Sequence, residues 1–112
     1  MVLRVLRRFP SVTATGVELS PAVWFLGFLR TRRYRVRFLL GSLFSQNIFD
    51  ADVVFLYMLP HMMEKIEAKL DAELRPGAVV ISHAVPFPHR VPAEEVLVPH
   101  GRRSVPLLRY VW

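Results

Sequence analysis

The hydrophobic pattern of the first half of the chain predicts two strands joined by a helix. Residues 12–18 are rich in Val and Thr, which favours a strand. Ser20 and the proline after it suit the N-cap and first position of a helix, which we expect over residues 21–34. Apolar residues surround most of this helix, as in a helix packed on a sheet. A second apolar run at residues 36–40 predicts the next strand, and Gly41 ends it.

The second half of the chain predicts two more strands around a helix, followed by a hairpin. Residues 51–60 are almost continuously apolar, as in an interior parallel strand that is covered on both faces. The helix follows at residues 61–77, and a mostly apolar fourth strand at residues 78–85. Two short apolar segments, residues 96–99 and 105–112, flank a polar turn and predict an antiparallel hairpin.

The helix at residues 61–77 has the clearest amphipathic pattern in the chain. One apolar stripe at helical spacing predicts the face that packs on the sheet. This stripe consists of Met63, Ile66, Leu70 and Leu74. The charged residues that we expect elsewhere on the helix are Glu64, Lys65, Glu67, Lys69, Asp71 and Glu73.

The order of these elements predicts an α/β fold. Helices alternate with strands up to the final hairpin, which is typical of a mainly parallel sheet with helices packed against it. The sequence contains no internal repeat, low-complexity tract or linker, and 112 residues are enough for one domain with a modest core. We therefore expect a single domain over residues 1–112.

Composition excludes several classes of protein. Hydrophobic residues make up 53% of the chain, which excludes a disordered protein. Cysteine is absent, which excludes a disulfide framework and agrees with a reducing, cytoplasmic location. No apolar run approaches the roughly 20 residues of a membrane span. The first ten residues are interrupted by arginines and do not resemble a signal peptide.

Positive charge is concentrated at the start of the chain. The first forty residues carry eight arginines and a single acid, Glu18, whereas the rest carries seven bases and eight acids. A basic half can indicate a nucleic acid, an anionic membrane surface or an acidic partner, or it can be a solvated surface. The cluster on which a nucleic-acid contact would depend consists of Arg30, Arg32, Arg33, Arg35 and Arg37.

Glu18 is placed where a ligand-binding acid is expected in an α/β fold. It ends the first predicted strand, and ligands of doubly wound folds bind at the carboxyl ends of parallel strands. A carboxylate at this position can accept hydrogen bonds from the paired hydroxyls of a ribose. The alternative is an exposed acid near a helix N-terminus, stabilised by the helix dipole by about 0.3–1 kcal/mol.

Three segments together resemble the class I, or seven-strand, S-adenosylmethionine-dependent methyltransferases. They read GVELSP at residues 16–21, YMLP at residues 57–60 and ELRPGAVVISHAVPFP at residues 73–88, in matching order and spacing. Within that class the chain is most similar to the small protein-lysine methyltransferases of mitochondrial carrier and ATP-synthase subunits, with their bacterial relatives. The resemblance implies a Rossmann-like fold, S-adenosylmethionine as cofactor and a protein lysine as methyl acceptor.

The resemblance implies a cofactor site at the ends of the first two strands. Glu18 would bind the ribose hydroxyls. Ser42 stands where many such enzymes have an Asp that contacts the adenine amino group, so a shorter, neutral group replaces the acid. The implied cofactor-binding residues are Glu18, Leu19, Ser20, Ser42, Leu43 and Phe44.

The resemblance also implies an acceptor site after the third predicted strand. Tyr57 to Pro60 match a proline-rich family segment that faces the transferred methyl group, although only the aromatic residue and the final proline are kept. We interpret Tyr57 and Pro60 as the catalytic residues; the alternative for Tyr57 is a core tyrosine. His83 and His89 flank a nearby loop. They are either proton shuttles or ordinary loop residues. The histidines lack the spacing of a zinc motif, and we expect no metal site.

The glycine-rich turn that follows the first strand of such enzymes is missing. In dinucleotide-binding folds the ribose-binding acid follows this turn by about 20 residues, and counting back from Glu18 reaches Met1. The five glycines lie far apart, at Gly16, Gly27, Gly41, Gly77 and Gly101. We therefore expect an N-terminally truncated methyltransferase that begins inside a helix at residues 2–9 and lacks the central first strand.

Loss of that strand would leave two sheet edges unpaired, which a buried sheet does not tolerate. Two functions other than methyl transfer also stay open. One is a small basic domain that binds nucleic acid or an anionic surface. The other is a non-catalytic relic that forms homo-oligomers through its unpaired edges.

Overall fold

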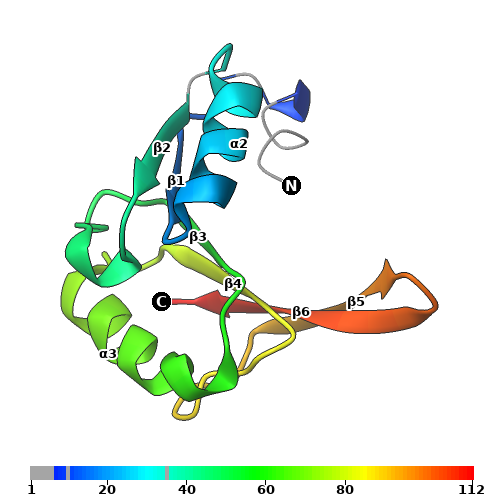
Figure 1. Cartoon of the computed structure of the whole chain (residues 1–112). Coiled ribbons are helices and arrows are strands. Elements are labelled where there is room, and N and C mark those ends of the chain that lie inside the picture. Colours follow the sequence, from blue (N-terminus) through cyan, green and yellow to red (C-terminus); the bar gives the residue numbers. More distant parts are fainter. Residues whose placement is uncertain (1–6, 10, 35) are drawn as a thin grey trace. The chain divides into compact units, whose positions relative to one another are not determined.

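A computed structural model of the protein describes residues 7–9, 11–34 and 36–112. The chain divides into two compact units, Met1–Gln46 and Asn47–Trp112, coloured blue to green and green to red in Figure 1. Most of the helix predicted at residues 2–9 lies outside the described residues, as does Arg35 of the basic cluster. The single domain that we predicted over the whole chain stays a prediction.

The first unit is a β–α–β motif. Strands β1 (Ala14–Glu18) and β2 (Val36–Leu40) pair in parallel, and helix α2 (Pro21–Thr31) connects them. A 3₁₀-helix, η1 (Leu43–Ser45), follows β2. The three main elements are confirmed, with β1 beginning two residues later and α2 ending three residues earlier than predicted.

Two glycines allow Phe38 to pack at the centre of the first unit. A Cβ atom added to Gly16 of β1 would lie 2.8 Å from Cε2 of the Phe38 ring, and one added to Gly27 of α2 would lie 2.5 Å from its Cζ. The ring therefore contacts the backbone of both elements. The indole N–H of Trp24 donates to the Phe38 carbonyl at 2.8 Å and ties α2 to β2.

Gly27→Ala is expected to destabilise the first unit by about 1–3 kcal/mol, because the new methyl group overlaps a ring that is already held on its other side. In an exposed helix the same change would stabilise by about 1 kcal/mol. Urea denaturation followed by Trp24 fluorescence in a Trp112→Phe background measures the effect. In a Phe38→Leu background the penalty should largely disappear, and a stabilising effect with Phe38 present would contradict this packing.

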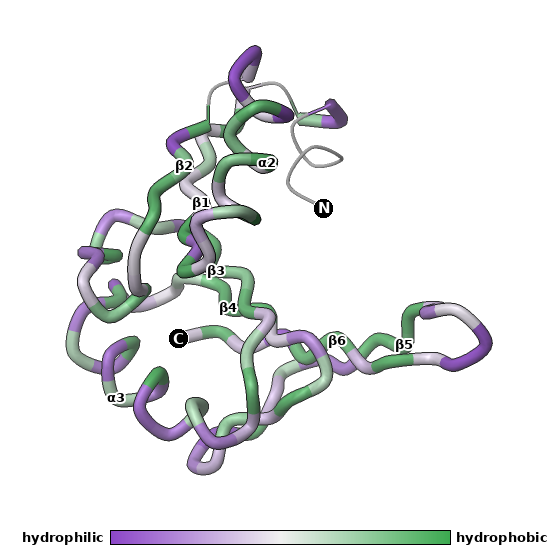
Figure 2. Tube along the Cα trace, viewed as in Figure 1, coloured by the Kyte–Doolittle hydropathy of each residue, from purple (hydrophilic) through white to green (hydrophobic). Residues whose placement is uncertain are grey.

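Helix α2 exposes a broad apolar surface. Its one buried residue among those described is Thr31, whose hydroxyl donates to the Gly27 carbonyl at 2.7 Å. Figure 2 shows hydrophobic colours along much of the helix. The large apolar side chains that are more than 40% exposed are Val23, Phe25, Leu26, Phe28 and Leu29. Among the described residues no helix is long and apolar enough to cross a membrane.

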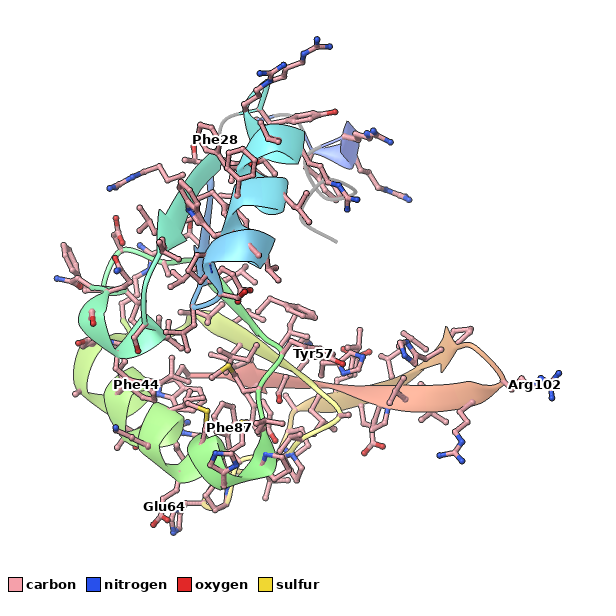
Figure 3. The ribbon with its side chains drawn as sticks, in the orientation of Figure 1. Phe28, Phe44, Tyr57, Glu64, Phe87 and Arg102 are labelled. Atoms are coloured by element: carbon pink, nitrogen blue, oxygen red, sulfur yellow. The ribbon has the colours of Figure 1, made fainter. Side chains whose placement is uncertain are left out.

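The second unit is a four-stranded sheet with one α-helix. Its elements are β3 (Val53–Leu56), η2 (Pro60–Met62), α3 (Met63–Glu73), β4 (Val79–His83), β5 (Glu94–His100) and β6 (Arg103–Val111). The strand order is β3-β4-β6-β5, with β3 and β4 parallel and the other pairs antiparallel. The α/β fold and the closing hairpin are confirmed. The hairpin extends as a ribbon beyond α3, with Arg102 at its tip (Figures 1 and 3).

The core of the second unit lies between α3 and the sheet. The predicted apolar stripe is confirmed, because Met63, Ile66, Leu70 and Leu74 are all 7% exposed or less. Val80, Leu108 and Tyr110 supply the buried side of the sheet. The Tyr110 hydroxyl accepts a hydrogen bond from the Phe87 amide at 3.1 Å, and the ring centres of Phe87 and Trp112 lie 5.1 Å apart.

Glu67 does not belong to the polar face of α3, as the sequence pattern predicted. Its side chain is only 4% exposed, and its Oε2 lies 3.0 Å from Nδ1 of His89. Glu67 comes four residues after Met63 and three before Leu70, so it shares their buried face. Glu64, by contrast, is exposed on the outside of the helix (Figure 3).

Four strands, β1, β2, β3 and β5, have one edge without a strand partner in the part of the chain that the structure describes. There β1 pairs only with β2, and β3 pairs only with β4. The prediction that residues 51–60 form an interior strand is therefore wrong here, and Val53 is 58% exposed. An apolar composition reports burial of a strand's faces and does not reveal whether both of its edges are paired. Association of copies through these edges stays a prediction.

Candidate functional site

The predicted cofactor-binding residues gather at one end of the β1–β2 pair. Glu18 ends β1 opposite Leu40, the last residue of β2. The Gly41 amide donates to the Glu18 carbonyl at 2.9 Å, which carries the pairing one residue past β2. The loops that follow the two strands therefore begin side by side. The end of β1 and the loop after it carry Glu18, Leu19 and Ser20. The loop after β2 leads into Ser42, Leu43 and Phe44.

Local hydrogen bonds hold the acid and the hydroxyl group of this cluster. The Ser20 amide donates to Oε1 of Glu18 at 3.1 Å. The Phe44 amide donates to Oγ of Ser42 at 3.2 Å, which caps η1. Ser20 occupies the N-cap position of α2, but its side chain makes no capping hydrogen bond. Within the described residues, Oε2 of Glu18 and the hydroxyl hydrogen of Ser42 have no other partner and can bind a ligand.

A pocket of about 450 Å³ lies at the end of the β3–β4 pair in the second unit. Leu56 pairs with Ser82, so Tyr57 and His83 are the next residues along two neighbouring strands. Their ring centres are 4.7 Å apart, and the His100 ring lies edge-on to His83 at 6.0 Å. Figure 3 shows where Tyr57 lies, just after β3. The other lining residues are Met58, Leu59, Pro60, Ala84, Val85 and Val105.

The wall of this pocket is apolar and aromatic, and no Asp, Glu, Lys or Arg is among its lining residues. Tyr57 is 72% exposed, so the alternative prediction of a core tyrosine is wrong. Beyond His83, Ala84 has a φ of 66°, a left-handed conformation that is uncommon for residues other than glycine. The Ser82 hydroxyl donates to the Val85 carbonyl at 2.5 Å and holds this turn at the pocket.

The structure separates the two histidines that flank the loop after β4. His83 lines the pocket, whereas His89 binds Glu67 on α3. The same loop is tied to α3 a second time by Arg90, whose Nη2 lies 3.0 Å from Asp71 Oδ1. His89 is therefore an anchor of the loop, and of these two histidines only His83 lines the pocket.

His100 is the pocket residue that sequence reasoning missed. It ends β5, far along the chain from Tyr57 and His83, and reaches the pocket because the hairpin folds back beside β4. No local motif surrounds it in the sequence, so only the order of the strands could have shown its position.

The described arginines of the basic cluster are all exposed on the first unit. Arg30 ends the exposed stretch of α2, Arg32 and Arg33 follow the helix, and Arg37 lies on β2. Within the described residues none of the four forms an ion pair. They remain available to an anionic partner.

Comparison of the sequence with models of protein families shows which family this chain belongs to. The model of the ANTKMT methyltransferase domain matches residues 1–94. The chain belongs to this family. A Rattus norvegicus lysine N-methyltransferase, named for an ATP synthase subunit, is 34% identical over 90 residues, which covers 75% of this chain and 39% of that protein. Its Homo sapiens counterpart is 34% identical over 86 residues, covering 71% and 36%.

More distant members of the methyltransferases agree with this assignment. A protein-lysine N-methyltransferase of Saccharolobus islandicus is 32% identical over 71 residues, covering 63% of this chain and 44% of that protein. The crystal structure of an RNA methyltransferase from Salinibacter ruber in complex with S-adenosyl-L-homocysteine superposes with a TM-score of 0.86 at 27% identity, covering 98% of this chain and 71% of that one. The chain thus spans less than half the length of the curated relatives it matches.

Proposed function

We propose that this chain is a methyltransferase domain that uses S-adenosylmethionine to methylate a lysine amine of a protein. The observation that carries the proposal is the grouping of Glu18–Ser20 with Ser42–Phe44 at the carboxyl ends of two parallel strands, in a chain of this family. The relatives named as lysine N-methyltransferases support lysine as the acceptor.

The residues at the ends of β1 and β2 fit the nucleoside part of this cofactor. The uncommitted oxygen of Glu18 can accept from a ribose hydroxyl, and the Ser42 hydroxyl can hydrogen-bond the adenine edge. Leu19, which is 65% exposed, offers an apolar surface beside them. Leu43 and Phe44 are half-buried and can contact the base. Bound there, S-adenosylmethionine supplies a methyl group activated by its sulfonium charge.

Tyr57 and Pro60 fit the wall of an acceptor site. Both line the pocket of the second unit, whose apolar surface suits the four-carbon stem of a lysine. Burial of the amine in such a pocket favours its neutral form. Orientation of that amine is then the main contribution that the protein must make.

Transfer of a radiolabelled methyl group tests the proposal. The 112-residue chain is mixed with the labelled cofactor, with total RNA and with the ATP synthase protein for which the mammalian relatives are named, and the products are separated before hydrolysis. We expect label in methyl-lysine. No transfer to any acceptor would contradict methyltransferase activity of this chain.

RNA is a second candidate acceptor, and the same experiment distinguishes it. Two observations favour it: the RNA methyltransferase that superposes on this chain, and the exposed basic residues Arg30, Arg32, Arg33 and Arg37. Label confined to RNA would support this alternative. RNA binding through these arginines would also weaken steeply as salt is added, because bound counterions are released from the phosphates.

A further inference from the structure

Methylation of lysine requires that its amine first lose a proton. Lysine in water has a pKa of about 10.4, so it reaches a protein at neutral pH as an ammonium ion. Only the neutral amine has the lone pair that attacks a methyl group. A proton acceptor beside the amine therefore accelerates the reaction, by about 10²–10⁴-fold in typical enzymes.

The pocket of the second unit offers few groups that can take this proton. Its lining contains no carboxylate, so the proton acceptors that remain are the imidazoles of His83 and His100. Tyr57 is the other polar side chain of the lining, and its hydroxyl can donate or accept a hydrogen bond. Histidine is the side chain that binds and releases protons most readily near neutral pH.

His83 is the better placed of the two imidazoles. It is half-buried at the end of β4, and its backbone is held by β6, where it pairs with Leu107. Its ring lies against both Tyr57 and His100. His100, by contrast, is exposed at the last position of β5, next to the hairpin turn. Within the described residues neither ring nitrogen of His83 has a hydrogen-bond partner, so one is available to the substrate.

We infer that His83 is the catalytic base that deprotonates the lysine ammonium in the Tyr57–His83–His100 pocket, an assignment that rests on the proposed lysine methylation. One N–H bond of the ammonium breaks, and its electron pair becomes the lone pair of the amine. The proton binds the free nitrogen of the imidazole, which becomes an imidazolium and later releases it to solvent. The centre of the Tyr57 ring is 4.7 Å from the imidazole centre, close enough to interact favourably with that charge.

The pH dependence of methyl transfer by the full chain tests this role. At pH 7, His83→Gln is expected to lower the rate about 100-fold. The rate of the His83→Gln variant should then rise about tenfold per pH unit. The reason is that the neutral fraction of free lysine also rises about tenfold per pH unit below the lysine pKa of about 10.4. The rate of the wild type should depend much less on pH. His61→Gln, which changes an exposed histidine that is not among the pocket-lining residues, is the matched control and should follow the wild type.

A second measurement needs neither catalytic turnover nor a substituted chain. In the wild-type chain without cofactor, n-butylamine mimics the lysine side chain and histidine ring resonances are followed by NMR. We expect saturable shifts of the His83 resonance and none of the His61 resonance. Unchanged His83 signals would overturn the inference.

The two failures can be told apart. If the wild type methylates lysine and His83→Gln keeps its rate and pH profile, His83 is not the base and the proposed function stands. If the wild type transfers no methyl group to lysine, the proposed function is contradicted, and the role of His83 as the base is contradicted as well.

Discussion

Glu18→Ala is expected to weaken the binding of S-adenosylmethionine by about 2–4 kcal/mol, or roughly 30- to 1000-fold. A charge-assisted hydrogen bond from a ribose hydroxyl contributes about 1.5–3 kcal/mol when water is excluded. Alanine removes that acceptor and also the oxygen that binds the Ser20 amide at 3.1 Å. Isothermal titration calorimetry of the cofactor into the 112-residue chain measures the loss.

Glu18→Gln is the control that separates ligand binding from local structure. Its amide oxygen can still accept from Ser20, but the negative charge is gone. We expect an affinity between those of the wild type and Glu18→Ala, with the circular dichroism spectrum unchanged. If all three chains bind the cofactor equally, Glu18 serves only to order the turn into α2.

Leu70→Ala is expected to lower the free energy of unfolding of the second unit by about 2–5 kcal/mol. Leu70 is 1% exposed in the centre of the α3 stripe, so the substitution removes apolar contacts and leaves a cavity. A loss of this size is a large fraction of the stability of a small protein. Urea denaturation followed by Trp112 fluorescence in a Trp24→Phe background gives the value.

Leu97→Ala is the matched control, because it deletes the same atoms from a leucine that is 65% exposed on β5. We expect a change within about 0.5 kcal/mol. Equal losses at the two positions would mean that α3 does not pack on the sheet as described, and would also remove the support that α3 gives to the loop at the pocket.

Much of the residue cluster at the ends of β1 and β2 was predictable from the sequence. The carboxyl ends of neighbouring parallel strands lie at one edge of a sheet, so residues just after two such strands must be close. Glu18 and Ser42 follow that rule, and the register confirms it, with Glu18 opposite Leu40. The way in which Glu18 is held, by the amide of Ser20, was not predictable, because it depends on the local backbone at the start of α2.

The pocket at the end of the β3–β4 pair was predictable only in part. Tyr57 and Pro60 were recognised from a partial motif, and both line the pocket. His83 and His89 were equivalent in the sequence, since both flank the same loop. Their separation depends on α3, where the buried Glu67 binds His89 and leaves His83 to the pocket.

The sequence by itself determined the helices and strands, the apolar stripe of α3 and the family, because hydrophobic periodicity, turn residues and motif order are local properties of a chain. The tertiary structure decided which strands are edges, that Glu67 binds His89 and that His100 joins Tyr57 and His83. These features depend on contacts between residues far apart in sequence, and the free energy of such contacts is set by the packing of whole elements rather than by any short segment.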